Sequence, residues 1–250
     1  MKGSEIARLR DRWADEDVAD VQRQLLDQSR AVKGPHGLRP RWPDTDDGLV
    51  DLRGITTDGY GLRIRYLTLE RIDLSFACGE VGSFQSELSD CRFDSVRLAG
   101  QSSFNRRLER CSFRDAKLHR LSLGLRVVDC DFTGVTAHRL RSEPDTVFER
   151  CAFAGADLRG AEFRHASFVD CTFDEARFSA STVFERCSFP RTGVEFAEAR
   201  VSRSTGDGTP LPDRWAGRAE AETAFATYLN RYVRAVRSGD EDSMPMESEE

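Results

Sequence analysis

The residues best suited to chemistry in this sequence are its seven cysteines and four histidines. Thiolates and imidazoles bind zinc, and both residue types serve in nucleophilic or acid–base catalysis. The cysteines contain no C-x-x-C pair, however, and the histidines are scattered at His36, His119, His138 and His165. This spacing predicts no zinc site and no other metal site.

Two of the histidines, His119 and His138, are 19 residues apart, so they share a face if the chain repeats at about that distance. No carboxylate is evident beside them in the sequence. We therefore interpret them as a surface pair rather than as metal ligands.

Motifs of the common enzyme classes are absent from the sequence. It contains no G-x-S-x-G nucleophile elbow, no phosphate-binding P-loop and no dinucleotide-binding fingerprint. Carboxylates are numerous, but the rod-shaped repeat fold that the spacing below predicts offers no cleft that would shift their pKa values. We predict a non-enzymatic protein without catalytic residues and without a cofactor.

The cysteines do follow a regular spacing, which identifies the elements that hold them. The motif Cys-x-Phe occurs six times, and the first five of its cysteines follow one another at distances of 20, 19, 21 and 20 residues. Helices repeat every 3.6 residues and strands every two, so neither element explains this distance. A coil of about 20 residues explains it, and the motifs then form one ladder of thiols and one of rings. The ladders consist of Cys91, Cys111, Cys130, Cys151 and Cys171, and of Phe93, Phe113, Phe132, Phe153 and Phe173.

A shorter period is visible between Phe148 and Phe178, where every fifth residue is large and apolar. A small residue lies two positions before each of these from Cys151 onward. In a short extended segment the first and third side chains point to the same side, and two further residues turn a corner. Four such units close one coil, and successive coils stack about 4.8 Å apart. We predict an all-β solenoid, a quadrilateral β-helix of about seven coils with α-helices at both ends.

The thiols are expected to lie inside this coil, where cysteine is a common buried residue. Stacked neighbours have Cβ atoms about 4.8 Å apart, which is beyond the usual disulfide range of about 3.5–4.5 Å. We predict reduced thiols and a cytoplasmic protein. Cys187 follows Cys171 by only 16 residues, so we predict that it belongs to a different wall.

Charged residues directly precede the ladder cysteines, and their sign alternates. If the cysteines stack, these side chains also stack and form a ladder of salt bridges on the surface. Each pair contributes little at an exposed site, although the pairs also fix the register of the coils. The ladder consists of Asp90, Arg110, Asp129, Arg150 and Asp170.

The five-residue pattern resembles the A-(D/N)-L-x-x repeat of the pentapeptide-repeat family, most clearly at Ala156-Asp157-Leu158-Arg159-Gly160. The resemblance covers roughly residues 48–202 and implies a right-handed quadrilateral β-helix. It implies no single function, since some members imitate B-DNA and protect or inhibit DNA gyrase, a type II topoisomerase. Resembling proteins also dimerise through C-terminal elements.

The sequence predicts further regions around the repeats of residues 48–202. For residues 1–47 the sequence predicts helices that cap the first coil, followed by a linker. The alternative is that these helices bind a partner. Residues 203–238 predict a turn-rich linker over 203–212 and then an amphipathic helix that caps the last coil or joins two chains into a homodimer. Residues 239–250 are acidic and predict a disordered tail. The apolar side of the amphipathic helix consists of Trp215, Phe225, Leu229, Tyr232 and Val236.

Two stretches within the repeats depart from the pattern. The register blurs over residues 75–83 and resumes afterwards. Residues 138–146 depart most, and their one extra residue predicts a bulge or small loop at a corner.

Charge and composition narrow the function. The net charge of −6 and the pI of about 5.4 disfavour a protein that binds nucleic acid directly by neutralising phosphates. No apolar run has the length of a membrane span, and the first residues do not form a signal peptide. We predict a scaffold that binds a protein partner, whose identity the sequence does not specify, through a solenoid wall or a terminal helix. The alternative is a DNA mimic that binds DNA gyrase, and a continuous acidic stripe along the rod would favour it.

Overall fold

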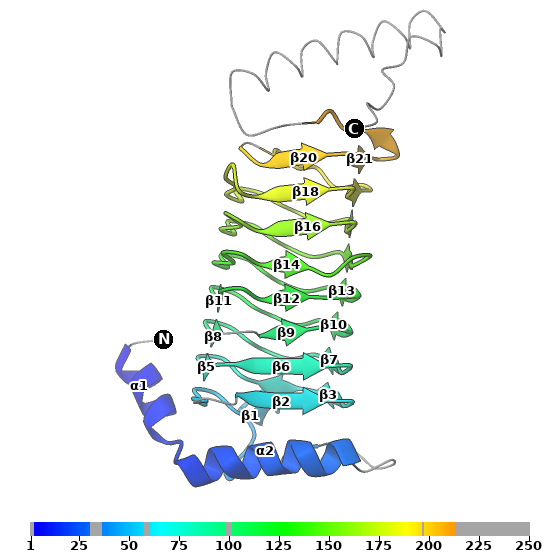
Figure 1. The fold of residues 1–250 in the computed structure, drawn as a ribbon. Helices are drawn as coiled ribbons and strands as arrows, with labels where there is room; N and C mark the ends of the chain where they lie inside the picture. Colours follow the sequence, from blue (N-terminus) through cyan, green and yellow to red (C-terminus); the bar gives the residue numbers. More distant parts are fainter. Residues whose placement is uncertain (1–2, 31–36, 58–60, 99–101, 197, 214–250) are drawn as a thin grey trace, which may run out of the picture.

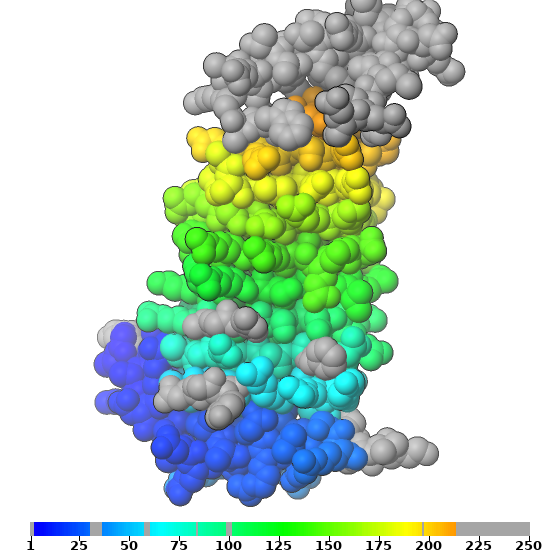
Figure 2. All heavy atoms as spheres, in the orientation of Figure 1, coloured from blue at the N-terminus to red at the C-terminus, as the bar shows by residue number. Residues whose placement is uncertain are grey.

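The computed structural model describes residues 3–30, 37–57, 61–98, 102–196 and 198–213. Within these ranges the chain forms a β-solenoid of about eight coils, with two helices at its N-terminal end (Figure 1). The space-filling view shows one rod, with the helices against its first coils (Figure 2). The predicted C-terminal helix, including Trp215, Phe225, Leu229, Tyr232 and Val236, and the acidic tail lie outside the described residues.

The coils have four walls, which we number in chain order within a coil starting from β2. Wall 1 is an eight-stranded parallel sheet and wall 2 a nine-stranded sheet that is parallel except for its last pair. Wall 1 consists of β2 (Leu62–Arg65), β6 (Val81–Phe84), β9 (Ser103–Phe104), β12 (Ser122–Leu123), β14 (Arg141–Ser142), β16 (Glu162–Arg164), β18 (Val183–Glu185) and β20 (Arg200–Ser202). Wall 2 consists of β3 (Thr68–Glu70), β7 (Glu87–Ser89), β10 (Arg107–Glu109), β13 (Arg126–Val128), β15 (Val147–Glu149), β17 (Ser167–Val169), β19 (Ser188–Phe189), β21 (Thr205–Gly206) and β22 (Thr209–Pro210).

The other two walls have shorter strands, continued upward by single bridging residues. Wall 3 begins with β1 (Val50–Asp51) and β4 (Ile72–Asp73), and continues through Arg92, Ser112, Asp131, Ala152 and Thr172. Wall 4 contains β5 (Cys78–Gly79), β8 (Arg97–Leu98) and β11 (Lys117–Leu118), preceded by Thr56 and continued by Thr136, Asp157 and Arg177.

The corners between walls are made by left-handed backbone. Among the described residues, twenty-one other than glycine have positive φ angles, from Tyr66 to Asp207. L-residues adopt this conformation at a cost, so it persists only where the surrounding structure enforces it. Here the ladder of backbone hydrogen bonds between coils enforces it, as in the bond from Asp129 N–H to the Glu149 carbonyl, at 2.9 Å.

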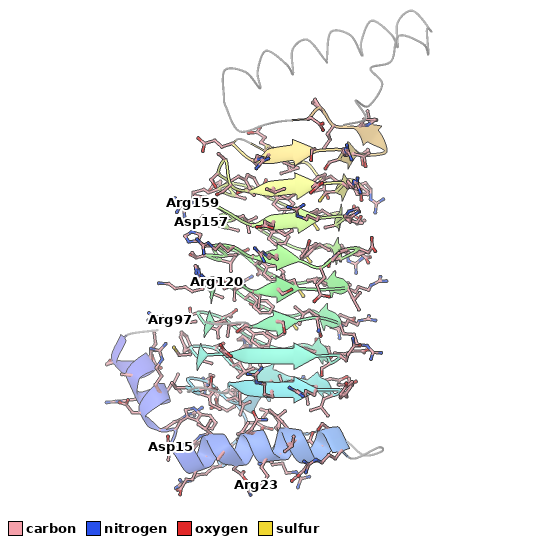
Figure 3. The ribbon with its side chains drawn as sticks, in the orientation of Figure 1. Asp15, Arg23, Arg97, Arg120, Asp157 and Arg159 are labelled. Carbon is pink, nitrogen blue, oxygen red and sulfur yellow. The ribbon has the colours of Figure 1, made fainter. Side chains whose placement is uncertain are left out.

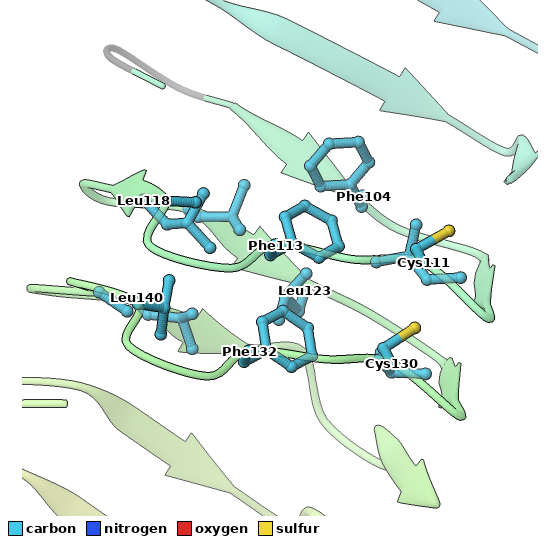
Figure 4. Packing of buried hydrophobic residues seen from close by; sticks show 14 of the residues in the cluster. Phe104, Cys111, Phe113, Leu118, Leu123, Cys130, Phe132 and Leu140 are labelled. Carbon is cyan, nitrogen blue, oxygen red and sulfur yellow. The ribbon is translucent and has the colours of Figure 1, made fainter. Parts of the chain in front are cut away.

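Stacked phenylalanine rings fill the solenoid. Within the predicted ladder the ring centroids are 4.7–5.0 Å apart and the planes lie within 9° of parallel. Figure 4 shows Phe113 over Phe132, with Cys111 over Cys130 beside them. A second stack, Phe148–Phe168–Phe189, lines wall 2 with spacings of 4.8 and 5.2 Å. The two stacks meet edge to face, for example between Phe148 and Phe153.

Helix α2 (Asp15–Arg30) lies across the open end of the first coil (Figure 1). Its Val21 and Leu25 are buried against the core. The Gln22 side-chain amide accepts from the Arg63 N–H at 2.9 Å and donates to the Arg63 carbonyl at 3.5 Å. This glutamine therefore takes the place of a neighbouring strand at the edge of β2.

Helix α1 (Gly3–Asp11) is joined to wall 3 of the first coil by Arg12, which directly follows it. The carboxylate of Asp51, whose side chain is 4% exposed, accepts hydrogen bonds from the guanidinium groups of Arg12 and Arg53. Burial alone would raise the pKa of Asp51, but these hydrogen bonds hold it well below its usual range. The Arg12 guanidinium also contacts the Trp13 and Trp42 rings, 5.5 and 5.2 Å from their centroids.

We expect Asp51→Asn to lower the free energy of unfolding by about 2–3 kcal/mol, because two guanidinium groups lose their charged partner. A carboxylate whose pKa is lowered by folding stabilises the fold above about pH 4, and this contribution is lost as the pH falls further. Urea denaturation between pH 7 and pH 2 should therefore show that the free energy of unfolding falls less steeply with falling pH in the variant than in the wild type. The control Asp20→Asn removes an exposed pair with Arg23 and should change stability by less than about 0.5 kcal/mol.

The structure corrects the sequence predictions at the C-terminal end of the solenoid. The coils number about eight rather than seven. Residues 203–212, predicted as a linker, continue wall 2 as β21 and then turn back through Asp207-Gly208 into antiparallel β22. Asp-Gly is a common hairpin turn, so the residues that suggest a linker in the sequence instead form a tight turn.

The irregular stretches of the sequence stay within the coil pattern. Residues 75–83 contain β5 and the start of β6. The extra residue of 138–146 is accommodated at the corner between walls 1 and 2, where Pro144 and Asp145 form a turn and Thr146 points inward. Strand β14 keeps its register with β12, so the predicted bulge is a longer corner.

Candidate functional surface

The described residues do not assemble a metal site or a membrane-spanning helix. In these ranges no three His, Cys, Asp or Glu side chains are grouped so that they could hold a metal ion. None of the helices described has the length and apolar character that a membrane crossing needs. The candidate functional surface therefore consists of the ladders and the outer walls.

The thiol ladder is sealed inside the solenoid. All seven cysteines carry free thiols, and the five ladder cysteines are at most 3% exposed. Each ladder thiol donates to the backbone carbonyl two residues earlier, at 3.2–3.5 Å. Burial raises the pKa of the Cys130 thiol. Because these thiols are buried out of reach of solvent and substrates, the geometry assigns the ladder a packing role.

Cys187 lies one corner away from this ladder. Its N–H donates to Ser204 in the next coil, and Ser188, the residue after it, donates to the Ala166 carbonyl in the previous one. It therefore belongs to the column at the corner between walls 1 and 2. Burial raises the pKa of this thiol to about 12.

The charged residues that precede the ladder cysteines lie in one column, at the corner between walls 2 and 3. The column is longer than the five predicted residues, since Arg71 precedes them and Arg191 and Asp207 follow. Each arginine that pairs reaches back to the aspartate of the preceding coil. The Nε···O distances of these pairs are 2.7 Å for Arg110–Asp90, 2.6 Å for Arg150–Asp129 and 2.6 Å for Arg191–Asp170.

These hydrogen bonds act on the carboxylates. The Arg150 guanidinium lowers the pKa of Asp129, and Arg191 does the same for Asp170. Arg110, one coil before Asp129, adds a weaker favourable charge interaction. The column is therefore a series of close pairs with weaker attraction between them.

We expect Asp129→Arg to lower the melting temperature by about 2–4 °C more than Asp174→Arg does. The first change leaves three cations in succession at positions 110, 129 and 150. Asp174 is also exposed but makes no ion pair with a described residue, so its reversal adds the same charge without breaking a pair. Calorimetry of the two variants measures the difference, and equal melting temperatures would contradict a stabilising column.

Wall 4 has a different charge pattern, since most of its outward residues from the third coil upward are basic. In Figure 3, Arg97, Arg120 and Arg159 lie on the same edge of the rod, with Asp157 near Arg159. Backbone pairing aligns Arg97 with Lys117, and Arg120 with Arg139 in the next coil. We call this surface the basic wall; it consists of Arg97, Lys117, His119, Arg120, His138, Arg139, Arg159 and Arg177, and surrounds the single carboxylate Asp157.

Asp157 balances only the upper part of the basic wall. Its buried carboxylate lies 2.7 Å from Arg159 and 3.5 Å from Arg177, measured to a guanidinium nitrogen. Hydrogen bonds from Arg159 hold its pKa well below the usual range. His138 Nε2 is 3.4 Å from the same carboxylate. The sequence interpretation that no carboxylate lies beside the histidine pair was therefore wrong for His138, because Asp157 is one coil away and not a sequence neighbour.

The lower part of the basic wall carries cations that no described residue pairs with. Arg97, Lys117, Arg120 and Arg139 are exposed, and none forms an ion pair with a described residue. Many arginines on the other walls are paired, for example Arg126 with Glu149 at 2.9 Å. The basic wall thus has uncompensated positive charge in three successive coils, on a protein whose net charge is −6.

No outward column of the described coils is continuously acidic. Wall 3 is the most acidic, with Asp94, Asp131 and Asp174 facing outward, yet arginines, threonines and alanines interrupt it in both columns. One of these columns reads Arg53, Ser75, Asp94, Arg114, Thr133, Ala154 and Asp174. Along the described columns, no more than two carboxylates occupy successive coils.

The sequence prediction missed the basic wall, although the necessary signal is present. Arg97, Lys117 and Arg177 are each the fourth residue after a ladder phenylalanine, and Arg120 and Arg139 are each the seventh. The prediction followed only the column that precedes the cysteines. Comparing the residues at each fixed distance from the ladder phenylalanines shows the positive charge of the basic wall.

A family model matches one part of the repeat region. Residues 145–179 match the family model described as pentapeptide repeats, with 8 copies. This stretch contains β15, β16 and β17. No curated protein matches the chain.

The solved structures that are similar share little sequence with the chain. Full-length QnrB1, a plasmid-mediated fluoroquinolone resistance protein, is 15% identical over 64% of this chain and 91% of that chain, with a TM-score of 0.29. A trypsin-treated form of QnrB1 is 14% identical over 64% and 92%, with a TM-score of 0.30. HetL from the cyanobacterium Nostoc sp., a pentapeptide repeat protein involved in heterocyst differentiation regulation, is 13% identical over 66% and 91%, with a TM-score of 0.22.

Proposed function

Since the chain carries pentapeptide repeats, we propose that it is a non-enzymatic scaffold whose basic wall binds an acidic segment of a protein partner. The observation that carries this proposal is a group of exposed cations that form no ion pair with a described residue, Arg97, Lys117, Arg120 and Arg139. Complementary charge on a partner steers association and fixes its orientation.

The solenoid supports such binding because it holds these charges at fixed positions. Each cation directly precedes a buried leucine, such as Leu118 after Lys117, which is 0% exposed. A rigid surface loses little conformational freedom on binding, so more of the electrostatic attraction remains as affinity.

The width of the basic wall favours a protein segment over nucleic acid. A wall of three extended residues is about 10 Å across, which suits one extended chain. Asp94, Asp115 and Glu175 lie on wall 3 or on its corner with wall 4, where they would repel the second strand of a duplex. The net charge of −6 also weakens the general attraction to phosphate.

Fluorescence anisotropy with labelled decaglutamate tests the proposal on the full chain. The variant Arg97→Glu/Lys117→Glu/Arg120→Glu should weaken binding at least about tenfold, because each lost contact contributes a fraction of a kcal/mol and each new charge repels. The matched control Arg65→Glu/Arg186→Glu/Arg200→Glu changes the net charge equally, at exposed arginines of other walls without described ion pairs, and should bind like the wild type. Equal binding by all three proteins, or tighter binding of a labelled DNA duplex than of decaglutamate, would overturn the proposal.

The resemblance also raised the hypothesis of a DNA mimic that binds a type II topoisomerase. That function needs a continuous acidic surface, and the described columns do not favour it. A gyrase supercoiling assay, with and without a fluoroquinolone, measures it directly. Loss of supercoiling or protection from the drug by the full chain would revive the hypothesis.

A further inference from the structure

The chain itself contains a segment complementary to the basic wall. Residues 238–250, S-G-D-E-D-S-M-P-M-E-S-E-E, carry six carboxylate side chains and no lysine or arginine. The basic wall carries six lysine and arginine side chains around one aspartate. Residues 238–250 therefore resemble, in charge, the acidic segment that the proposed function requires of a partner.

The connection between the two is long enough. Described structure ends at Asp213 beyond the last coil, and 24 residues lie between it and Ser238. These residues span about 36 Å as a helix or about 80 Å when extended. The coils of Arg97 and Arg139 lie about three to five coil spacings from the last coil, which is about 14–24 Å. The acidic segment can therefore reach the basic wall in either case.

We propose that the acidic segment Ser238–Glu250 occupies the basic wall of its own chain and is displaced by the partner. This inference rests on the proposed function, since it concerns the same surface. Tethering gives the segment an effective concentration of the order of 1 mM at the wall. A free acidic partner then competes with the segment. Any change that removes charge from the segment therefore strengthens binding of the partner to the basic wall.

The lysines of the chain make the contact directly measurable. The sequence has only three lysines, Lys2, Lys33 and Lys117, and Lys117 lies within the basic wall. A water-soluble carbodiimide joins a carboxylate to a nearby lysine amine as an amide, with loss of one water. After digestion with trypsin, the product expected from the full chain is peptide 238–250 joined to peptide 115–120.

We expect this product from monomeric protein at low salt, and at least about tenfold less at 0.5 M salt, where charges are screened. The control Lys117→Arg/Arg65→Lys moves the amine to wall 1 and should give no product with peptide 238–250. Two results would overturn the inference: equal cross-linking at both positions, or the product only in dimer-sized protein, which would assign the contact to a second copy.

Decaglutamate binding separates this inference from the proposed function. Replacing the six acidic residues by amides in the full chain should tighten decaglutamate binding about tenfold, because the competing segment loses its charge. The same replacement in the Arg97→Glu/Lys117→Glu/Arg120→Glu background should have no effect. If decaglutamate binds the wall but the amide variant binds no tighter, the inference fails and the proposed function stands. If neither form binds decaglutamate, the proposed function itself fails.

Discussion

Phe153→Ala is expected to lower the free energy of unfolding by about 3–5 kcal/mol. The Phe153 ring is 1% exposed and lies between Phe132 and Phe173, with centroid distances of 5.0 and 4.8 Å. It also meets Phe148 and Phe168 edge to face. Truncation leaves a cavity in the middle of the rod, where the rigid coils above and below cannot collapse into it, and it removes favourable ring contacts on both faces. Urea denaturation followed by circular dichroism measures the loss.

Phe196→Ala provides the comparison for this result. Phe196 is 8% exposed and packs edge to face on Phe184 and Phe189 near the last coil. We expect a smaller loss, because the surrounding chain near the end of the rod can adjust. A loss for Phe153→Ala no larger than that for Phe196→Ala would contradict a ladder that stabilises through stacking on both faces.

Ser95→Pro should be at least as damaging as the loss of a core ring, with a cost above about 3 kcal/mol. Ser95 forms the corner between walls 3 and 4 and has a φ of 54°, whereas proline fixes φ near −65°. Its N–H also donates to the Arg114 carbonyl of the next coil at 2.8 Å, and proline has no N–H to donate. Both effects disrupt the same corner, and thermal denaturation measures them.

Ser95→Gly separates the corner conformation from the side chain. Glycine adopts positive φ without strain, so this variant should keep the wild-type melting temperature or exceed it slightly. The corner argument would be untenable if the glycine variant lost as much stability as the proline variant.

The repeat itself could be predicted from the sequence because its side chains are dictated by the interior. Five successive coils place one ring and one thiol at the same place in the interior, and this appears directly as Cys-x-Phe at intervals of 19–21 residues. The positions of Phe93 and Phe113 inside the rod follow from that interval. The number of coils was less predictable, since Thr205-Gly206 pairs in wall 2 through its backbone and has no large apolar side chain to mark it.

The charge pattern of the walls was harder to predict. Outward side chains tolerate almost any polar residue, so their columns emerge only once the register of every coil is known. One-residue changes in corner length, as at Pro144 and Asp145, alter that register. The Asp157 contact with His138 joins residues 19 positions apart, and the Gln22 contact with Arg63 joins a helix to a strand 41 positions away. No local pattern encodes such contacts.

The glutamine of α2 that pairs with the backbone of β2 has a consequence for how molecules meet. A bare first coil would present four short rows of unpaired amide groups, which match the last coil of another molecule. Rods of this kind would then add end to end into fibres without limit. By filling the edge of β2 with a side chain that no strand can continue, α2 opposes such end-to-end addition at wall 1.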